Sequence, residues 1–210
     1  MAADGWILWI ELGLSAAALA VALWLRPWRM LGGALLSPAL AVVVVLPLLW
    51  SLPAALPAGL PLRVSGASAV VLMLGWPLAV PALWLAALVT WLVGDAQVGA
   101  LAAQLWWLGV LPATLAVALG AALRRWLPPN PFVYTLGRGF LGTAAVVFVS
   151  GAGLLAAHPL QADQAVVAMW LLAWGDAFLT GLLCATFVAF APQWLATWSD
   201  ARYLRPPPRP

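Results

Sequence analysis

Long apolar runs without a charged residue dominate this chain and restrict it to one class of fold. Leu14–Leu25 and Val42–Leu49 are examples, and charged residues make up only 7% of the sequence. Soluble domains carry about a quarter charged residues, so runs of this kind belong in lipid. In a membrane only helices and closed barrels satisfy every backbone polar group, and barrel strands would alternate apolar with polar residues. The sequence therefore predicts an all-α, polytopic helical membrane bundle.

The spacing of the apolar runs predicts about seven transmembrane helices in a single integral membrane domain, residues 1–204. No basic residue precedes the first run, so we interpret it as a retained span and not as a signal peptide. Residues 205–210 are rich in proline and arginine and are predicted to form a cytoplasmic tail. The expected spans are about Trp6–Leu25, Leu31–Leu52, two crossings within Leu62–Val93, Val98–Leu123, Arg138–Ala157 and Val166–Phe190.

The nine basic residues are all arginine, and they decide how often Leu62–Val93 crosses the membrane. If it crosses twice, eight arginines fall on the cytoplasmic side and only Arg63 lies outside. If it crosses once, Arg124, Arg125 and Arg138 move outside, which the positive-inside rule disfavours. Two crossings place the N-terminus outside and the C-terminus in the cytoplasm of a bacterial inner membrane.

The two crossings within Leu62–Val93 are expected to be irregular. Each has about sixteen residues, whereas an upright span needs about twenty. The sequence Gly75-Trp76-Pro77 is a break signal near the middle of the segment. We therefore expect short, re-entrant or shielded helices. Broken segments at membrane depth line protein or water-filled cavities, so this region is the expected substrate path.

Tryptophan is unusually frequent, with fifteen residues. Indole rings favour the membrane–water interface, which explains the tryptophans near the expected span ends. The deeper ones suit either packing or contact with a flat cofactor carried by a partner; their spacing selects no cofactor, and none is predicted. The expected interfacial group is Trp6, Trp9, Trp24, Trp28, Trp50, Trp126, Trp194 and Trp198, and the deeper group is Trp84, Trp91, Trp106, Trp107, Trp170 and Trp174.

Few ionisable residues are left inside the spans, and Asp176 is the most informative of them. It lies near the middle of the last span, where a buried carboxylate costs several kcal/mol unless it is neutral or paired. Its partner is expected to be Arg63, Arg138 or a backbone donor, or else it serves a polar ligand path. Glu11 lies about one turn inside the first span and is either interfacial or directed into the bundle.

Several functions are disfavoured by what the chain lacks. One histidine, His158, and one cysteine, Cys184, predict no protein-only metal site, since such sites normally need several of these ligands. No nucleophile motif or phosphate-binding loop occurs, so no enzyme activity is predicted. The sequence pI near 10 comes from arginines on one membrane face, which indicates topology and not nucleic-acid binding.

Four segments, in the same order, resemble the cobalt/nickel energy-coupling-factor membrane subunits of the CbiM-like family, and more closely their uncharacterised proteobacterial relatives. The resemblance covers about Leu60 to Leu204 and implies a helical substrate-capturing subunit that works with a coupling protein and cytoplasmic ATPases. The segments are Arg63–Trp76, Leu108–Pro112, Leu127–Tyr134 and Gly175–Gly181, the last followed by Pro192–Trp194 and Ser199–Leu204.

The departures from the family pattern concern the metal ligands. Metal-binding members begin Met-His, whereas this chain has Ala2, and Arg63 stands where the helix motif would place a histidine. A fixed cation would repel Ni²⁺ or Co²⁺, so the metal site is not carried over. Gln104 takes the place of the relatives' asparagine, and Asp176 matches the family's glutamate in kind and place.

Two functions follow as hypotheses. The first is a transport subunit of the energy-coupling-factor type, with Asp176, Arg63, Thr180 and Gln104 as substrate-path candidates. Its coupling protein would dock near Arg124, Arg125 and Arg138. The second is a non-transporting structural or accessory subunit of a larger membrane complex, which the missing ligands, the tryptophans and the Pro/Arg tail suit equally well.

Overall fold

The computed structural model describes residues 5–51, 63–93, 98–158 and 165–204, and within these ranges the chain is helical, with no β-strand. The predicted tail at 205–210 lies outside the described residues. Six stretches are long and apolar enough to cross a membrane, which confirms the helical bundle. They contain α1 (Gly5–Trp24), α2 (Leu36–Ser51), α4 (Trp76–Val93), α5 with α6 (Val98–Ala103 and Leu111–Trp126), α7 (Gly142–Ala157) and α8 (Ala165–Phe190).

The region predicted to cross twice contains only one helix of full length. Residues 63–66 are not helical, and the helix that follows, α3 (Ala67–Leu74), has eight residues. Eight residues rise about 12 Å, less than half of a bilayer core. Gly75 ends α3 at a φ of 74°, which lets the chain reverse into α4 without a Cβ clash. The predicted break at Gly75-Trp76-Pro77 is therefore confirmed, while the segment predicted to form the third crossing contains a helix of only eight residues.

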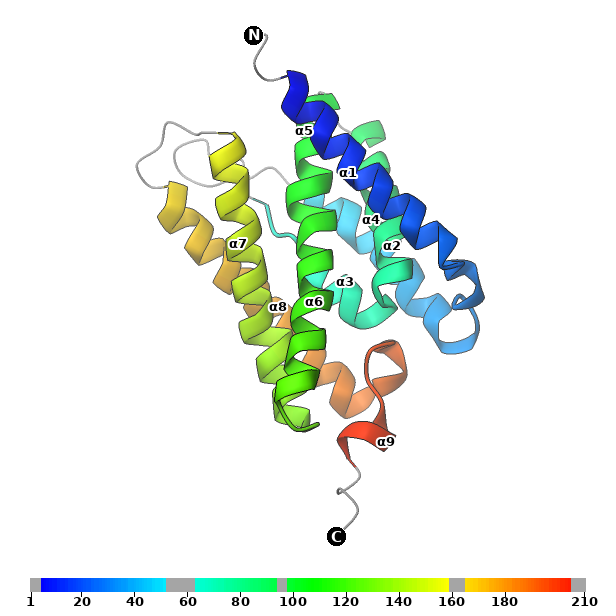
Figure 1. Ribbon diagram of the computed structural model, residues 1–210. Helices are drawn as coiled ribbons and strands as arrows, with labels where there is room; N and C mark the ends of the chain where they lie inside the picture. Colours follow the sequence, from blue (N-terminus) through cyan, green and yellow to red (C-terminus); the bar gives the residue numbers. More distant parts are fainter. Residues whose placement is uncertain (1–4, 52–62, 94–97, 159–164, 205–210) are drawn as a thin grey trace.

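The short helix α3 lies inside the bundle (Figure 1). Seven of its eight residues are buried, and it contacts α2, α4, α6 and α8. A helix that is apolar on all sides belongs in a protein core or in lipid, and the neighbours of α3 provide a protein core. The largest apolar cluster of the bundle is built around α3 and the first half of α4.

Two π-helical turns interrupt the long helices next to α3. The first, η4 (Gln104–Val110), joins α5 to α6, and the second, η5 (Val133–Leu141), leads into α7. Proline at 112 cannot donate a backbone N–H to the carbonyl of Leu108, four residues earlier, and its ring would crowd that oxygen. A wider turn before Pro112 relieves this conflict and leaves the Leu108 carbonyl available to another donor.

The tryptophans of the predicted interfacial group differ in their exposure. Trp24 and Trp126 are 80% and 77% exposed, and Trp6, Trp9 and Trp28 are also exposed. Trp50 is instead completely buried, because its indole donates to the Ser65 carbonyl of the non-helical segment. Trp198 is buried as well, since its ring stacks on Tyr203 at a centroid distance of 4.6 Å.

Most described arginines lie at one end of the bundle. In Figure 1, α1 begins at the upper end, whereas the α1–α2 connection, the α6–η5 connection and α9 (Asp200–Tyr203) lie toward the lower end. These lower segments carry Arg26, Arg29, Arg124, Arg125 and Arg202. The first and last described helices thus begin and end at opposite faces, and positive charge gathers at one of them.

Candidate functional site

The non-helical segment 63–66 brings together the residues that the sequence proposed as a substrate path. Its backbone has no helical ladder of its own, so its polar groups need other partners at the centre of an apolar bundle. Three elements supply them. Trp50 of α2 donates to the Ser65 carbonyl at 3.2 Å, Asp176 of α8 accepts from two backbone N–H groups, and Leu108 of η4 accepts from the Ser65 hydroxyl.

Asp176 holds the start of α3 in place. The Ser65 N–H donates to its Oδ2 at 3.0 Å and the Gly66 N–H at 3.2 Å, and the side chain is 1% exposed. Unpaired N–H groups at a helix start and the positive end of the helix dipole both favour a carboxylate there. Of the partners left open by the sequence, backbone donors are the ones found. Among the described residues, Asp176 forms no ion pair with Arg63 or Arg138.

Gly66 is required at this junction for two reasons. Its φ is +65°, in the left-handed region, where side chains other than glycine are strained. A Cβ there would also lie 2.9 Å from Cδ1 of Leu46. The glycine therefore lets α2 and the carboxylate of Asp176 approach the same stretch of backbone.

Ser65 links the segment to the π-turn. Its hydroxyl donates to the Leu108 carbonyl at 2.6 Å and accepts from the Ala67 N–H at 3.2 Å. The Leu108 oxygen is the one that Pro112 leaves without its helical donor. The Ser65 hydroxyl therefore supplies the donor that Pro112 cannot, although Ser65 and Leu108 are 43 residues apart.

Arg63 and Gln104, two of the predicted path residues, meet beside this junction. The Arg63 Nη1 donates to Oε1 of Gln104 at 2.8 Å. The Arg63 Nε and the Gln104 Nε2 are buried and find no partner among the described residues. An adjoining cavity of about 10 Å³, lined in part by Arg63 and Ser65, has room for about one water molecule.

Asp176 and Thr180 also face a larger, apolar groove. Its volume is about 320 Å³, and it runs along α2, α3 and α8, where Val45, Leu49 and Leu183 contribute to its wall. Thr180 lies one turn after Asp176, and its side chain is 2% exposed and faces the carboxylate. The groove thus leads from the outer face of the helices toward the non-helical segment.

A second polar cluster was not predicted from the sequence. Glu11 is 2% exposed, so its side chain is directed into the bundle. Its Oε1 accepts from the Trp107 indole at 2.6 Å and lies 2.6 Å from Nε2 of His158. Glu11 and His158 are 147 residues apart, and the only sequence signal for this pair is the rarity of ionisable residues in the spans.

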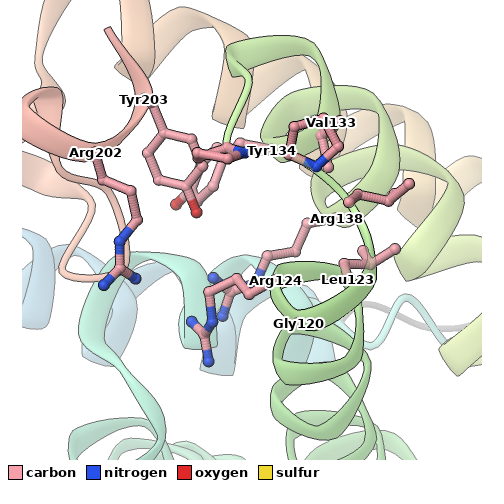
Figure 2. Close-up of a pocket in the computed structure, with 11 residues that line it drawn as sticks. Gly120, Leu123, Arg124, Val133, Tyr134, Arg138, Arg202 and Tyr203 are labelled. Atoms are coloured by element: carbon pink, nitrogen blue, oxygen red, sulfur yellow. The ribbon is translucent and has the colours of Figure 1, made fainter. Parts of the chain in front are cut away.

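The three predicted docking arginines have different surroundings. Arg124 and Arg125 are exposed at the end of α6, whereas Arg138 in η5 is buried. Arg124 and Arg138 line a pocket of about 290 Å³ together with Arg202 of α9 (Figure 2). Arg125 does not line it.

No three His, Cys, Asp or Glu side chains gather into a metal-binding group in the part of the chain that the structure describes. The structure thus defines the class of protein: an all-helical bundle with six helices suited to spanning a membrane. Comparison with known proteins adds no narrower class, because no family model, curated protein or solved structure matches the chain.

Proposed function

We propose that the chain is a multi-pass protein of a bacterial inner membrane that crosses it seven times, with the N-terminus outside and the C-terminus in the cytoplasm. In this topology residues 63–74 make the third crossing, partly as non-helical backbone. The opposite placement of α1's start and α9 supports an odd number of crossings (Figure 1). The arginines at the α9 end support a cytoplasmic location for that end.

Within this topology we propose a transport subunit, related to the energy-coupling-factor type that the sequence resembles. One observation carries the proposal: a non-helical segment and a half-length helix lie at the centre of the bundle, held by a buried carboxylate. Transporters bind substrates at broken helices of this kind, where backbone groups and helix ends replace the substrate's water.

The proposed substrate path runs beside the segment 63–66. Asp176 and Thr180 line the apolar groove, whereas Arg63, which is bonded to Gln104, lines the small cavity. Arg63 gives the second side a fixed positive charge, which favours a substrate with an anionic or polar group over a metal cation. The coupling protein would dock at the arginine-rich end.

A specific observation favours a second candidate, a structural or accessory subunit of a larger membrane complex. Most polar groups of Ser65 and Gly66 have hydrogen-bond partners on other elements of the chain, and the cavity beside Arg63 holds about one water molecule. In this alternative the polar centre fixes the fold, and the exposed apolar faces of the helices contact other subunits.

Cysteine labelling distinguishes the two functions without knowledge of the substrate. In a Cys184→Ala background, Val64→Cys places a thiol in the non-helical segment, and Ala67→Cys places a matched thiol in buried α3. A transport path admits water during its cycle, so we expect a membrane-impermeant maleimide to label position 64 in membranes but not position 67. An accessory subunit would leave both positions unlabelled.

Purification of the tagged chain in a gentle detergent, followed by mass spectrometry, tests the partner directly. A coupling protein with ATPases among the co-purifying proteins would support the transport proposal. A stable complex without ATPases would overturn it and support the accessory function.

A further inference from the structure

The pocket at the arginine-rich end is positively charged and has no acidic counterpart. Arg124 of α6, Arg138 of η5 and Arg202 of α9 line it from three different elements, with Tyr134 and Tyr203 beside them (Figure 2). None of its lining residues is acidic. The neighbouring carboxylate of Asp200 accepts a hydrogen bond from the Trp198 indole at 2.6 Å.

Arg138 is the unusual member of this group. It is 8% exposed, and its Nε and Nη1 are buried without a hydrogen-bond partner among the described residues. Its guanidinium lies over the ring of Tyr134, whose centroid is 5.8 Å from Cζ. A guanidinium stays protonated in proteins, and a buried charge without a partner is costly. The arrangement therefore calls for an anion that the chain itself does not provide here.

The backbone of α6 is shaped to admit this guanidinium. A Cβ at Gly120 would lie 2.5 Å from Nε and 2.8 Å from Cζ of Arg138. Any larger residue at position 120 would push the arginine out of its place. The glycine thus allows the Arg138 guanidinium to pack against α6. The pocket lies between this guanidinium and the arginines of α6 and α9.

We propose that this pocket binds a phosphate group, supplied by the headgroup of an anionic phospholipid. Arginine presents a planar set of donors that fits phosphate oxygens in a bidentate manner, and three arginines around one space suit such a group. Leu127, Pro128 and Pro129 give the pocket an apolar wall that suits the glycerol part of a lipid. Trp126, adjacent in sequence to this wall, is 77% exposed, as an interfacial tryptophan would be.

The location agrees with the chemistry. Basic pockets between transmembrane helices on the cytoplasmic side are known sites for anionic headgroups. Residues 205–210 contain two further arginines and no acidic side chain, so the sequence that follows α9 adds only positively charged side chains. The inference depends on the membrane topology proposed above and not on the transport function.

Lipid retention and thermal unfolding of the full-length chain test the inference. We expect native mass spectrometry to show retained phosphatidylglycerol but not phosphatidylcholine, and phosphatidylglycerol to raise the unfolding midpoint in detergent. Arg138→Met should weaken phosphatidylglycerol binding about tenfold or more, since it removes a charge-assisted contact. Arg124→Ala and Arg202→Ala should weaken it several-fold, and they are surface changes that keep the test valid if Arg138→Met does not fold. Arg125→Ala, an exposed arginine outside the pocket, is the matched control.

The possible results separate the sources of the anion. Stabilisation by phosphatidylglycerol that depends on Arg124 and Arg202 but not on Arg125 would support the lipid site. Equal stabilisation by inorganic phosphate with the same dependence would support phosphate recognition but assign it to a soluble solute. Equal effects of all three alanine substitutions, or no preference over phosphatidylcholine, would overturn the inference. If the arginine variants lost a co-purifying protein but kept their lipid, the inference would be overturned. The pocket would then bind a carboxylate of that protein and not a phospholipid.

Discussion

The two polar regions of this bundle differ in how completely they are satisfied. At the centre, the backbone groups of Ser65 and Gly66, the Ser65 hydroxyl and the Asp176 carboxylate find partners within the chain, although Arg63 Nε and Gln104 Nε2 beside them do not. At the arginine-rich end, Arg138 is nearly as buried as Asp176 but has two nitrogens without a partner among the described residues. Both regions bear charge in apolar surroundings, where an unpaired charge is expensive.

This difference separates polar groups that hold the fold from polar groups that await a ligand. A satisfied network loses stability when any member is removed, because its partners become unsatisfied. An unsatisfied charge has no such partners within the protein, and its removal changes ligand binding more than folding. The predictions below test this distinction at matched positions.

The largest effect is expected at Asp176. Asp176→Ala leaves the Ser65 and Gly66 N–H groups buried without an acceptor, so we expect a loss of about 3–5 kcal/mol of stability. Thr186→Ala changes an exposed polar residue on the same helix and should alter stability by less than about 0.5 kcal/mol. Unfolding titrations in mixed micelles measure both. Equal stability of the two variants would show that Asp176 does not hold the segment.

A smaller effect is expected when Gly120 is replaced by alanine, with the same substitution at Gly175 as the control. Gly120→Ala places a methyl group against the Arg138 guanidinium, so we expect a loss of about 1–3 kcal/mol and weaker phosphatidylglycerol binding. Gly175→Ala meets nothing within 4 Å and lies inside α8. Alanine favours a helix over glycine by about 1 kcal/mol, so this control should be neutral or slightly stabilising. Thermal unfolding of both variants is the measurement, and a reversed order would contradict the seating of Arg138 on α6.

The next effect comes from two buried serines of the same region. Ser65→Ala removes the donor to the Leu108 carbonyl, which Pro112 leaves without its helical partner, and should cost about 1–2 kcal/mol. Ser68 is equally buried, but its hydroxyl has no partner among the described residues. Ser68→Ala should therefore be neutral or stabilising. Similar losses in both variants would indicate that the Ser65–Leu108 bond contributes little.

Much of the fold was predictable because lipid imposes a simple rule on composition. The apolar runs predicted the helices, and Gly75-Trp76-Pro77 predicted the break after α3. The half length of α3 was not predictable. It depends on a non-helical segment that is stable only because Asp176, Trp50 and Leu108, all distant in sequence, supply its hydrogen-bond partners.

The site was predictable in its members and not in its connections. Rarity singled out Asp176, because an ionisable residue inside a span needs a compensating reason. Arg63 was singled out as the one arginine placed outside and by its position in the motif that the chain resembles. Composition did not show that backbone donors would pair with Asp176, or that Arg138 would lie buried with Arg124 and Arg202 around one pocket. Residue type limits the possible partners, whereas helix register and the two π-turns select among them.

The smallest expected effect concerns the Glu11 cluster, whose polar groups are only partly satisfied. Its Oε1 has two partners, yet its Oε2 is buried and has none among the described residues. The His158 side chain is 37% exposed, so water screens its interaction with Glu11. A double-mutant cycle of Glu11→Gln and His158→Gln should give a coupling of about 0.5–1 kcal/mol in unfolding experiments. A coupling near zero would assign the fixing of Glu11 to the Trp107 indole alone. A much larger coupling would make this pair a second strongly coupled polar contact, beside the network around Asp176.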